Sequence, residues 1–205
     1  MIEEFKVPRG SQLLQDLFAY SASKNNTYIE IGAAYPLKIN NTYQLEKKGW
    51  VGFSIELMQH RVDEWRDADR YNKIYCADAI EFDYLDALKE NHLPNRIGYL
   101  SCDIEPPVNT FSALKRVIEQ GIVFDCITFE HDRYQSDINY DPIVTKYLKD
   151  AGYKVAVSDV YRYRKFREEG KKKKVNKKCY METWYVNTDI NFPELTYDEW
   201  LETYK

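Results

Sequence analysis

The sequence lacks several features that would each assign it to a particular class of protein. Its four cysteines have no C-x-x-C spacing, and three of them fall inside apolar, strand-like runs, so we expect buried, reduced thiols. No segment approaches the ~20 consecutive apolar residues that span a bilayer, and residues 1–10 contain no apolar run of signal-peptide length. These absences predict a soluble, cytoplasmic protein with no membrane partner.

An excess of positive charge is also absent, which argues against a general nucleic-acid binder. Lys and Arg total 29 against 33 Asp and Glu, a net charge of −4. The average conceals residues 162–178, where ten Lys or Arg accompany only Glu168 and Glu169. This basic stretch is expected to be a solvated hairpin loop. Its alternative roles are to recruit an anionic acceptor, such as a nucleotide sugar or a phosphorylated glycan, or to contact nucleic acid nonspecifically.

Strand-like runs alternate with stretches of helical spacing, the pattern of a parallel sheet covered by helices. Residues 1–26 form an opening helical segment, with its helix at 11–23. The predicted strands are 27–31, 50–55, 73–77, 97–104 and 124–130, and the later helices are 38–48, 57–70, 84–91, 109–120 and 142–151. Residues 153–163 and 180–187 then form an antiparallel hairpin, and Thr196 with Glu199 has the capping-box spacing of a last helix. We therefore predict one α/β domain, residues 1–205, with a doubly wound, mostly parallel, Rossmann-like sheet.

Three consecutive predicted strands end in an acidic residue, at the edge where doubly wound sheets bind ligands. Glu30 precedes Gly32, where a glycine lets the backbone approach a ligand closely or make a tight turn. Glu56 is placed to accept both ribose hydroxyls, or to interact with the dipole of the next helix. Asp78 is placed to accept from an adenine amino group flanked by Ala79, or to cap a helix. Three acids in series favour a neutral or cationic nucleoside over a phosphate, and the G-x-G-x-x-G motif of nicotinamide-binding proteins is absent.

Further acid–base residues follow the fourth and fifth predicted strands. Asp103 and Glu105 come after one strand, and Glu130 and His131 after the other. Asp103 is the first candidate for a base that removes an acceptor's proton and His131 the second, with Glu105 beside them. Asp103, Glu130 and His131 could instead hold a divalent cation, or these residues could be caps and ion-pair partners of nearby arginines.

The chain from Tyr28 to His131 resembles the FkbM-type family of S-adenosylmethionine-dependent methyltransferases. The shared stretches are Glu30-Ile31-Gly32-Ala33, Asn41-Thr42-Tyr43 with Leu45-Glu46, 49–52 with Ile55-Glu56, Asp78, 99–105 and 127–131. The resemblance implies a class I methyltransferase fold that binds S-adenosylmethionine, with Glu30 and Gly32 near the methionine part, Glu56 on the ribose and Asp78 near the adenine. Ala33, Thr42, Leu57 and Ala79 complete the implied cofactor contacts.

The resemblance also implies methyl transfer to a hydroxyl, on a carbohydrate or a related small metabolite. This sequence departs from the family at Tyr35-Pro36 and Lys38, and again at Pro106-Pro107, where the family usually has a glycine. Those departures leave a noncatalytic cofactor-binding module of the same fold as an alternative. A methyltransferase that acts on nucleic acid through the basic stretch is a second alternative.

Overall fold

The structure is a computed structural model that describes residues 10–68, 70–167 and 174–204. Its described strands form one eight-stranded sheet in the order β3-β2-β1-β4-β5-β7-β6-β8. The strands are β1 (Thr27–Ile31), β2 (Val51–Glu56), β3 (Lys73–Cys76), β4 (Arg96–Cys102), β5 (Val123–Glu130), β6 (Tyr153–Arg167), β7 (Lys174–Asn187) and β8 (Leu195–Thr196). The first five are parallel, whereas β7 runs antiparallel to β5 and to β6. This confirms the predicted mostly parallel α/β sheet with an antiparallel hairpin at its end.

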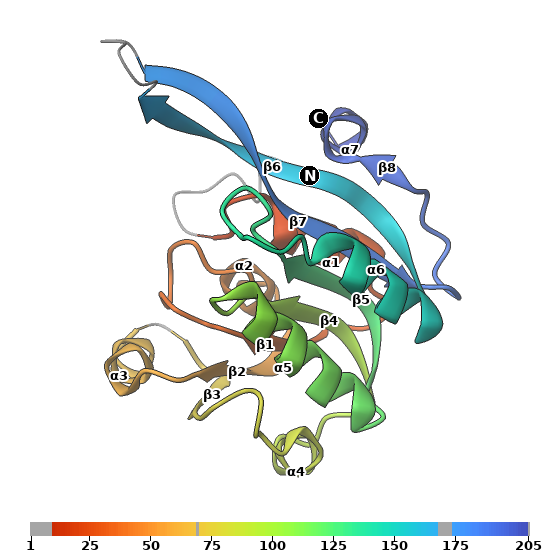
Figure 1. The fold of residues 1–205 in the computed structure, drawn as a ribbon. Coiled ribbons are helices and arrows are strands. Elements are labelled where there is room, and N and C mark those ends of the chain that lie inside the picture. The colour runs from red at the N-terminus through yellow and green to blue at the C-terminus, as the bar shows by residue number, and fades with distance from the viewer. Residues whose placement is uncertain (1–9, 69, 168–173, 205) are drawn as a thin grey trace.

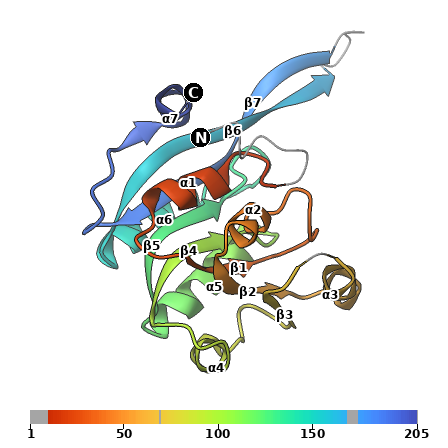
Figure 2. The same cartoon turned by 180° about the vertical axis from the view of Figure 1, so that it is seen from behind.

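Helices cover both faces of the sheet, as expected for parallel strands whose residues are buried on both sides. They are α1 (Gln15–Ala22), α2 (Tyr43–Lys47), α3 (Gln59–Arg66), α4 (Tyr84–Glu90), α5 (Pro107–Glu119), α6 (Asp141–Asp150) and α7 (Tyr197–Thr203). Ile29 and Ile31 of β1 belong to the core under α4, α5 and α6, while Tyr28 belongs to the core under α1, α2 and α7. Figure 1 has α5 and α6 in front of the sheet, and Figure 2 has α1 and α2 in front of it.

The basic stretch is mainly strand, so its prediction as a loop is wrong. Residues 162–167 continue β6 and residues 174–178 belong to β7, with Arg162 paired to Cys179 and Arg164 to Lys177. The two strands extend beyond the body of the sheet as a long ribbon (Figures 1 and 2). The backbone pairing of β6 with β7 continues through these polar, basic residues, which were expected to be a solvated loop. The centre of the predicted loop, residues 168–173, lies outside the described residues.

Two predicted helices begin later than expected because their first residues have left-handed backbone. Leu14 has a φ of 65°, and α1 starts only at Gln15. Ile39 has a φ of 52°, and Asn40 Oδ1 then accepts hydrogen bonds from the backbone N–H groups of Thr42 and Tyr43. The chain around 38–42 is therefore a loop that leads into α2, and this loop reappears in the candidate site below.

The structure also tests the predictions for the last helix, the cysteines and membrane-spanning segments. The capping box at Thr196 and Glu199 is confirmed, because the Thr196 hydroxyl accepts from the Glu199 N–H and the Glu199 carboxylate accepts from the Thr196 N–H. Cys102, Cys126 and Cys179 are buried free thiols as expected. The expectation of burial is wrong for Cys76, which is exposed at the end of β3 because β3 is the edge strand of the sheet. Within the described residues, no helix has the length and apolar character needed to cross a membrane.

Candidate functional site

Gly32 lies where β1 meets the loop after β4, and this close approach explains why glycine is needed. Its φ is +84°, and a Cβ built on it would lie 1.7 Å from the backbone oxygen of Asp103. The Gly32 N–H donates to the Ile55 carbonyl, and the Asp103 N–H donates to the Ile31 carbonyl, both at 3.0 Å. The backbone that Gly32 approaches is therefore that of the chain itself, and the contact fixes the β1 and β4 loops against each other.

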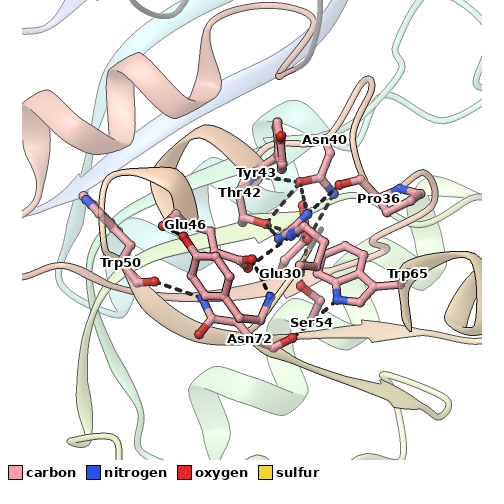
Figure 3. A network of polar contacts seen from close by, with 12 residues as sticks. Glu30, Pro36, Asn40, Thr42, Tyr43, Glu46, Trp50, Ser54, Trp65 and Asn72 are labelled. Atoms are coloured by element: carbon pink, nitrogen blue, oxygen red, sulfur yellow. Dashed lines mark hydrogen bonds and ion pairs between the residues drawn. The ribbon is translucent and has the colours of Figure 1, made fainter. Parts of the chain in front are cut away.

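Glu30 is 2% exposed and forms the centre of a buried polar network (Figure 3). Its Oε2 accepts from Ser54 Oγ at 2.8 Å, from Thr42 Oγ1 at 2.9 Å and from Asn40 Nδ2 at 3.3 Å. Burial raises the pKa of Glu30, while the charge of Arg70 and these hydrogen bonds lower it. Asn40 Nδ2 also donates to the Ala33 carbonyl at 3.1 Å. Glu30 and Thr42, both predicted cofactor contacts, thus share one network that shapes the loop after β1.

Arg70 supplies the positive charge of this network, a role that was not predicted from the sequence. Its guanidinium pairs with Glu46 at 3.1 Å, and both side chains are at most 1% exposed. It donates to the Pro36 carbonyl at 2.7 Å and to Thr42 Oγ1 at 3.0 Å, and it stacks on Trp65 with 3.6 Å to the ring centroid. Arg70 therefore connects the 33–42 loop to α2 and α3. Tyr35 and Pro36, where the sequence departs from the family pattern, lie in this loop, which the buried Arg70 side chain holds in place.

The residues predicted to hold a ribose and an adenine lie at the ends of β2 and β3. Glu56 Oε2 accepts from the Ala34 N–H and Oε1 from the Met58 N–H, both at 2.9 Å. An ionised carboxylate has about four acceptor sites, so Glu56 keeps acceptor capacity for two hydroxyls. Leu57 is 68% exposed beside it, which leaves apolar surface for a flat ring. Asp78 is exposed and accepts from the Ile80 N–H, while Ala79 is buried beneath it.

A cluster of carboxyl groups lies at the ends of β4 and β5. Asp103 and Glu130 hydrogen-bond each other, and Glu182 of β7 lies directly opposite Glu130 in the strand register. Burial raises the pKa of Glu130 far above its ordinary value, and the charge of Asp103 adds to the effect. Burial likewise raises the pKa of Glu182, to about 8. We infer that Glu130 stays protonated at neutral pH and donates to Asp103, which relieves the like-charge repulsion.

His131 lies apart from this cluster because successive strand residues point to opposite faces of a sheet. It is 1% exposed, and its Nε2 lies 3.4 Å from Thr183 Oγ1 and 4.0 Å from Asp141 Oδ1 at the start of α6. Burial lowers the pKa of His131. The structure thus does not bring His131 together with Asp103 and Glu130. Across the described ranges, no group of three His, Cys, Asp or Glu side chains is arranged to hold a metal ion.

A pocket of about 620 Å³ opens between the loops that follow β4 and β5. It begins at Glu105, two residues beyond the Asp103 backbone that touches Gly32, and so it adjoins the predicted cofactor edge. Its lining residues are Glu105, Pro106, Pro107, Val108, Asp132, Gln135, Ser136, Asp137, Ile138 and Tyr140. Pro106 and Pro107, where the sequence departs from the family pattern, therefore line one side of this pocket.

Comparison with known proteins adds the fold class. No family model matches the chain, and no curated protein matches its sequence. A protein of Thermoplasma acidophilum superposes with a TM-score of 0.51 at 7% identity, covering 86% of this chain and 87% of its own. A candidate rRNA methylase from Clostridium thermocellum superposes with a TM-score of 0.50 at 10% identity, covering 87% and 94% respectively. TrmK of M. capricolum, solved with S-adenosylhomocysteine, gives 0.47 at 10% identity, covering 89% and 69%.

At these identities the comparisons show the fold alone. The chain has the Rossmann-like fold of class I S-adenosylmethionine-dependent methyltransferases, with the mostly parallel sheet and the antiparallel β7 described above.

Proposed function

We propose that the protein transfers a methyl group from S-adenosylmethionine to a hydroxyl of a carbohydrate or a small metabolite. The observation that carries the proposal is the rim formed by Glu56 and Leu57, with Asp78 on the adjacent strand end. The Glu56 carboxylate has acceptor sites left for the two ribose hydroxyls, and the exposed Leu57 side chain offers apolar surface to the adenine ring. The resemblance of residues 28–131 to the FkbM-type family supports the hydroxyl acceptor.

The residues of this edge also fit the charge of the cofactor. S-adenosylmethionine carries a sulfonium cation and supplies an electrophilic methyl group to whichever acceptor atom faces it. Asp103, Glu105 and Asp132 provide negative charge on the adjoining loops, and each contributes to the field that raises the pKa of a neighbouring carboxyl group. A cation is stabilised in such a field, whereas a nucleotide phosphate is repelled. The same reasoning disfavours a nicotinamide dinucleotide at this edge.

Calorimetry with S-adenosylhomocysteine tests the cofactor assignment. The wild-type protein is expected to bind it, and Glu56→Gln to bind at least about tenfold more weakly, because hydrogen bonds to a charged group contribute about 1.5–3 kcal/mol each. Glu64→Gln is the matched control, since Glu64 is an exposed residue of α3 paired only with Arg61 in the ion pairs described. Absence of binding at high micromolar ligand, or equal binding by Glu56→Gln, would contradict the proposal.

The projecting ribbon of β6 and β7 supports a second candidate, methylation of nucleic acid. Exposed basic residues accompany Tyr163, which is 60% exposed, and Phe166, which is 39% exposed. Cationic and aromatic side chains on one arm suit single-stranded nucleic acid. If Lys165→Gln with Lys177→Gln left oligonucleotide binding and its salt dependence unchanged, this candidate would be discarded.

A further inference from the structure

The projecting ribbon of β6 and β7 extends past the edge of the sheet at which the cofactor is proposed to bind. β7 is antiparallel to β5, and Glu182 of β7 pairs with Glu130 at the carboxyl end of β5. From Val160 to Arg167, β6 continues to pair with β7 beyond that point (Figures 1 and 2). At about 3.3 Å per residue, this part of the ribbon is about 23 Å long. A ligand that contacts both the outer ribbon and the cofactor edge must therefore be a long molecule.

The strand register divides the side chains of the ribbon between two faces. Residues directly opposite each other share a face, and successive residues alternate between faces. Arg164 pairs with Lys177 and Phe166 with Val175, so these four side chains lie on one face, which we call the arginine face. Phe166 is 39% exposed and Val175 is 37% exposed. The arginine face thus combines two cationic side chains with apolar surface that is open to solvent.

The cations of the arginine face are not compensated by the protein. Among the described residues, neither Arg164 nor Lys177 forms an ion pair with a carboxylate. Lys178, on the opposite face, pairs with Asp198 at 2.8 Å. Like charges directly opposite each other destabilise a strand pair. The opposed Arg164 and Lys177 therefore form a site of net positive charge that a bound anion would stabilise.

The arginine face continues into the loop that follows β5. The Arg164 guanidinium lies over the ring of Tyr134, 4.6 Å from its centroid. Tyr134 lies between Asp132 and Gln135, which line the pocket beside the cofactor edge. On the opposite face, the Tyr161 hydroxyl donates to Asp198 of α7 at 2.6 Å. The arginine face therefore leads from the outer ribbon to the cofactor edge.

A single-stranded nucleic acid fits this surface. Cationic side chains follow its phosphates, and aromatic side chains stack on its bases. The edges of the ribbon are rich in Lys and Arg, which oppose pairing with a further strand and so disfavour a second protein chain. The acids Asp103 and Glu105 at the cofactor edge repel phosphates, so the phosphates would stay on the ribbon and a nucleoside would reach the edge.

We propose that the arginine face docks single-stranded RNA and presents one of its ribose hydroxyls at the cofactor edge. The inference rests on the proposed function, methyl transfer to a hydroxyl, and identifies the carbohydrate as the ribose of a polynucleotide, since RNA carries a 2′-hydroxyl on every nucleotide. Arg164 and Lys177 contact phosphates, and Phe166 stacks on a base.

Fluorescence anisotropy with a labelled single-stranded oligouridylate tests the docking. Arg164→Gln with Lys177→Gln is expected to weaken binding at least about tenfold and to lower the slope of log Kd against log salt by about 1.4, because each phosphate contact of a single strand contributes about 0.7. Lys165→Gln with Lys174→Gln removes the same charge from the opposite face and should weaken binding less than about threefold, because salt screens the more distant charges. No binding by the wild-type protein, or equal weakening by the two double variants, would overturn the proposal.

Stacking on a base distinguishes RNA from an acidic polymer without bases. Phe166→Leu is expected to weaken oligouridylate binding at least about fivefold and to leave heparin binding unchanged. Tyr163→Leu is the matched control, since Tyr163 is 60% exposed on the opposite face, and it should bind oligouridylate as the wild-type protein does. If Phe166→Leu bound oligouridylate with wild-type affinity, the ribbon would recognise charge alone and the proposal would be wrong.

Amide chemical shifts test whether the docked RNA reaches the cofactor edge. Oligouridylate is expected to shift the N–H signals of Lys177 and Val175 and also that of Tyr134, and changes confined to the ribbon would contradict the path to the edge. Unchanged signals of β1 and β4 in each variant show that it is folded.

The proposed function and the docking surface fail separately. S-adenosylhomocysteine binding is expected to persist in all of these variants, because none of the substituted residues lies at the ends of β1, β2 or β3. If oligouridylate binds with the predicted order of variants but S-adenosylhomocysteine does not bind, the methyltransferase proposal is wrong and the docking surface stands. If S-adenosylhomocysteine binds but the arginine-face variants bind oligouridylate as the wild-type protein does, the docking inference is wrong.

Discussion

Replacing Gly32 with alanine tests whether the contact between the β1 and β4 loops builds the candidate site. The chain supplies its own control, because Gly49 has nearly the same backbone conformation. Gly32 has a φ of +84° and Gly49 of +83°, but a Cβ at Gly49 meets nothing within 4 Å, whereas one at Gly32 lies 1.7 Å from the Asp103 oxygen. The two substitutions therefore share the cost of left-handed backbone and differ only in the clash.

The expected magnitudes follow from these two terms. Left-handed backbone costs alanine about 1–2 kcal/mol, and the stiffer unfolded chain returns about 0.4–1 kcal/mol, so Gly49→Ala should lose about 1 kcal/mol. At Gly32 the Asp103 carbonyl must also move away, which disrupts the hydrogen bonds to Ile55 and Ile31 at about 1 kcal/mol each. Gly32→Ala should therefore lose about 3 kcal/mol or more.

Thermal unfolding distinguishes the two outcomes. In a protein of this size each kcal/mol lowers Tm by about 2–4 °C, so we expect a fall of about 6–12 °C for Gly32→Ala and about 2–4 °C for Gly49→Ala. Gly32→Ala should also lose S-adenosylhomocysteine binding, since the moved loop carries Glu105 and adjoins the cofactor edge. Equal Tm values for the two variants would refute the reasoning.

Three further predictions concern stability. Arg70→Lys should lose about 3 kcal/mol in urea unfolding, because one ammonium cannot replace the paired and stacked guanidinium and leaves Glu46 poorly compensated; a loss no larger than that of the exposed Arg66→Lys would contradict this. Burial raises the pKa of Glu182 from 4.5 to about 8, so the folded state holds a proton that the unfolded chain releases, and the free energy of unfolding should fall between about pH 5 and 8. Tm measured across that pH range should therefore depend less on pH in Glu182→Gln than in the wild-type protein. The same pH dependence of Tm in both proteins would count against the raised pKa of Glu182. Ala34 has a φ of 44°, so Ala34→Gly should raise Tm by about 1–3 °C, and a lowered Tm would show that the conformation is not strained.

The sheet was predictable because its signals are local. Each parallel strand is a short apolar run, and residues 27–31 were predicted with the observed bounds of β1. Glu30 near the end of β1, Glu56 at the end of β2 and Asp78 just after β3 were assigned to one edge of the sheet by the topology rule alone. The need for glycine at position 32 was also readable, although its reason, the approach of the Asp103 backbone, requires the tertiary structure.

The buried charges were not predictable from the same sequence. Arg70 follows a polar helix and resembles a surface residue, yet its side chain is 0% exposed. Glu182 lies within a strand, and its position opposite Glu130 depends on the antiparallel register of β5 and β7. Asp132 directly follows His131, but only the loop that returns to Gln135 shows that one of its oxygens is free. Register and loop closure are long-range properties, and they determine which acidic side chains are buried close to one another.

Amide chemical-shift mapping with S-adenosylhomocysteine tests the central claim most directly. If the cofactor lies at the carboxyl ends of β1, β2 and β3, the largest changes should fall on the N–H groups of Ala33, Leu57 and Ala79, with none on Lys177 of the projecting ribbon. Changes confined to the ribbon, or no changes at saturating ligand, would contradict the account of this edge as a cofactor site.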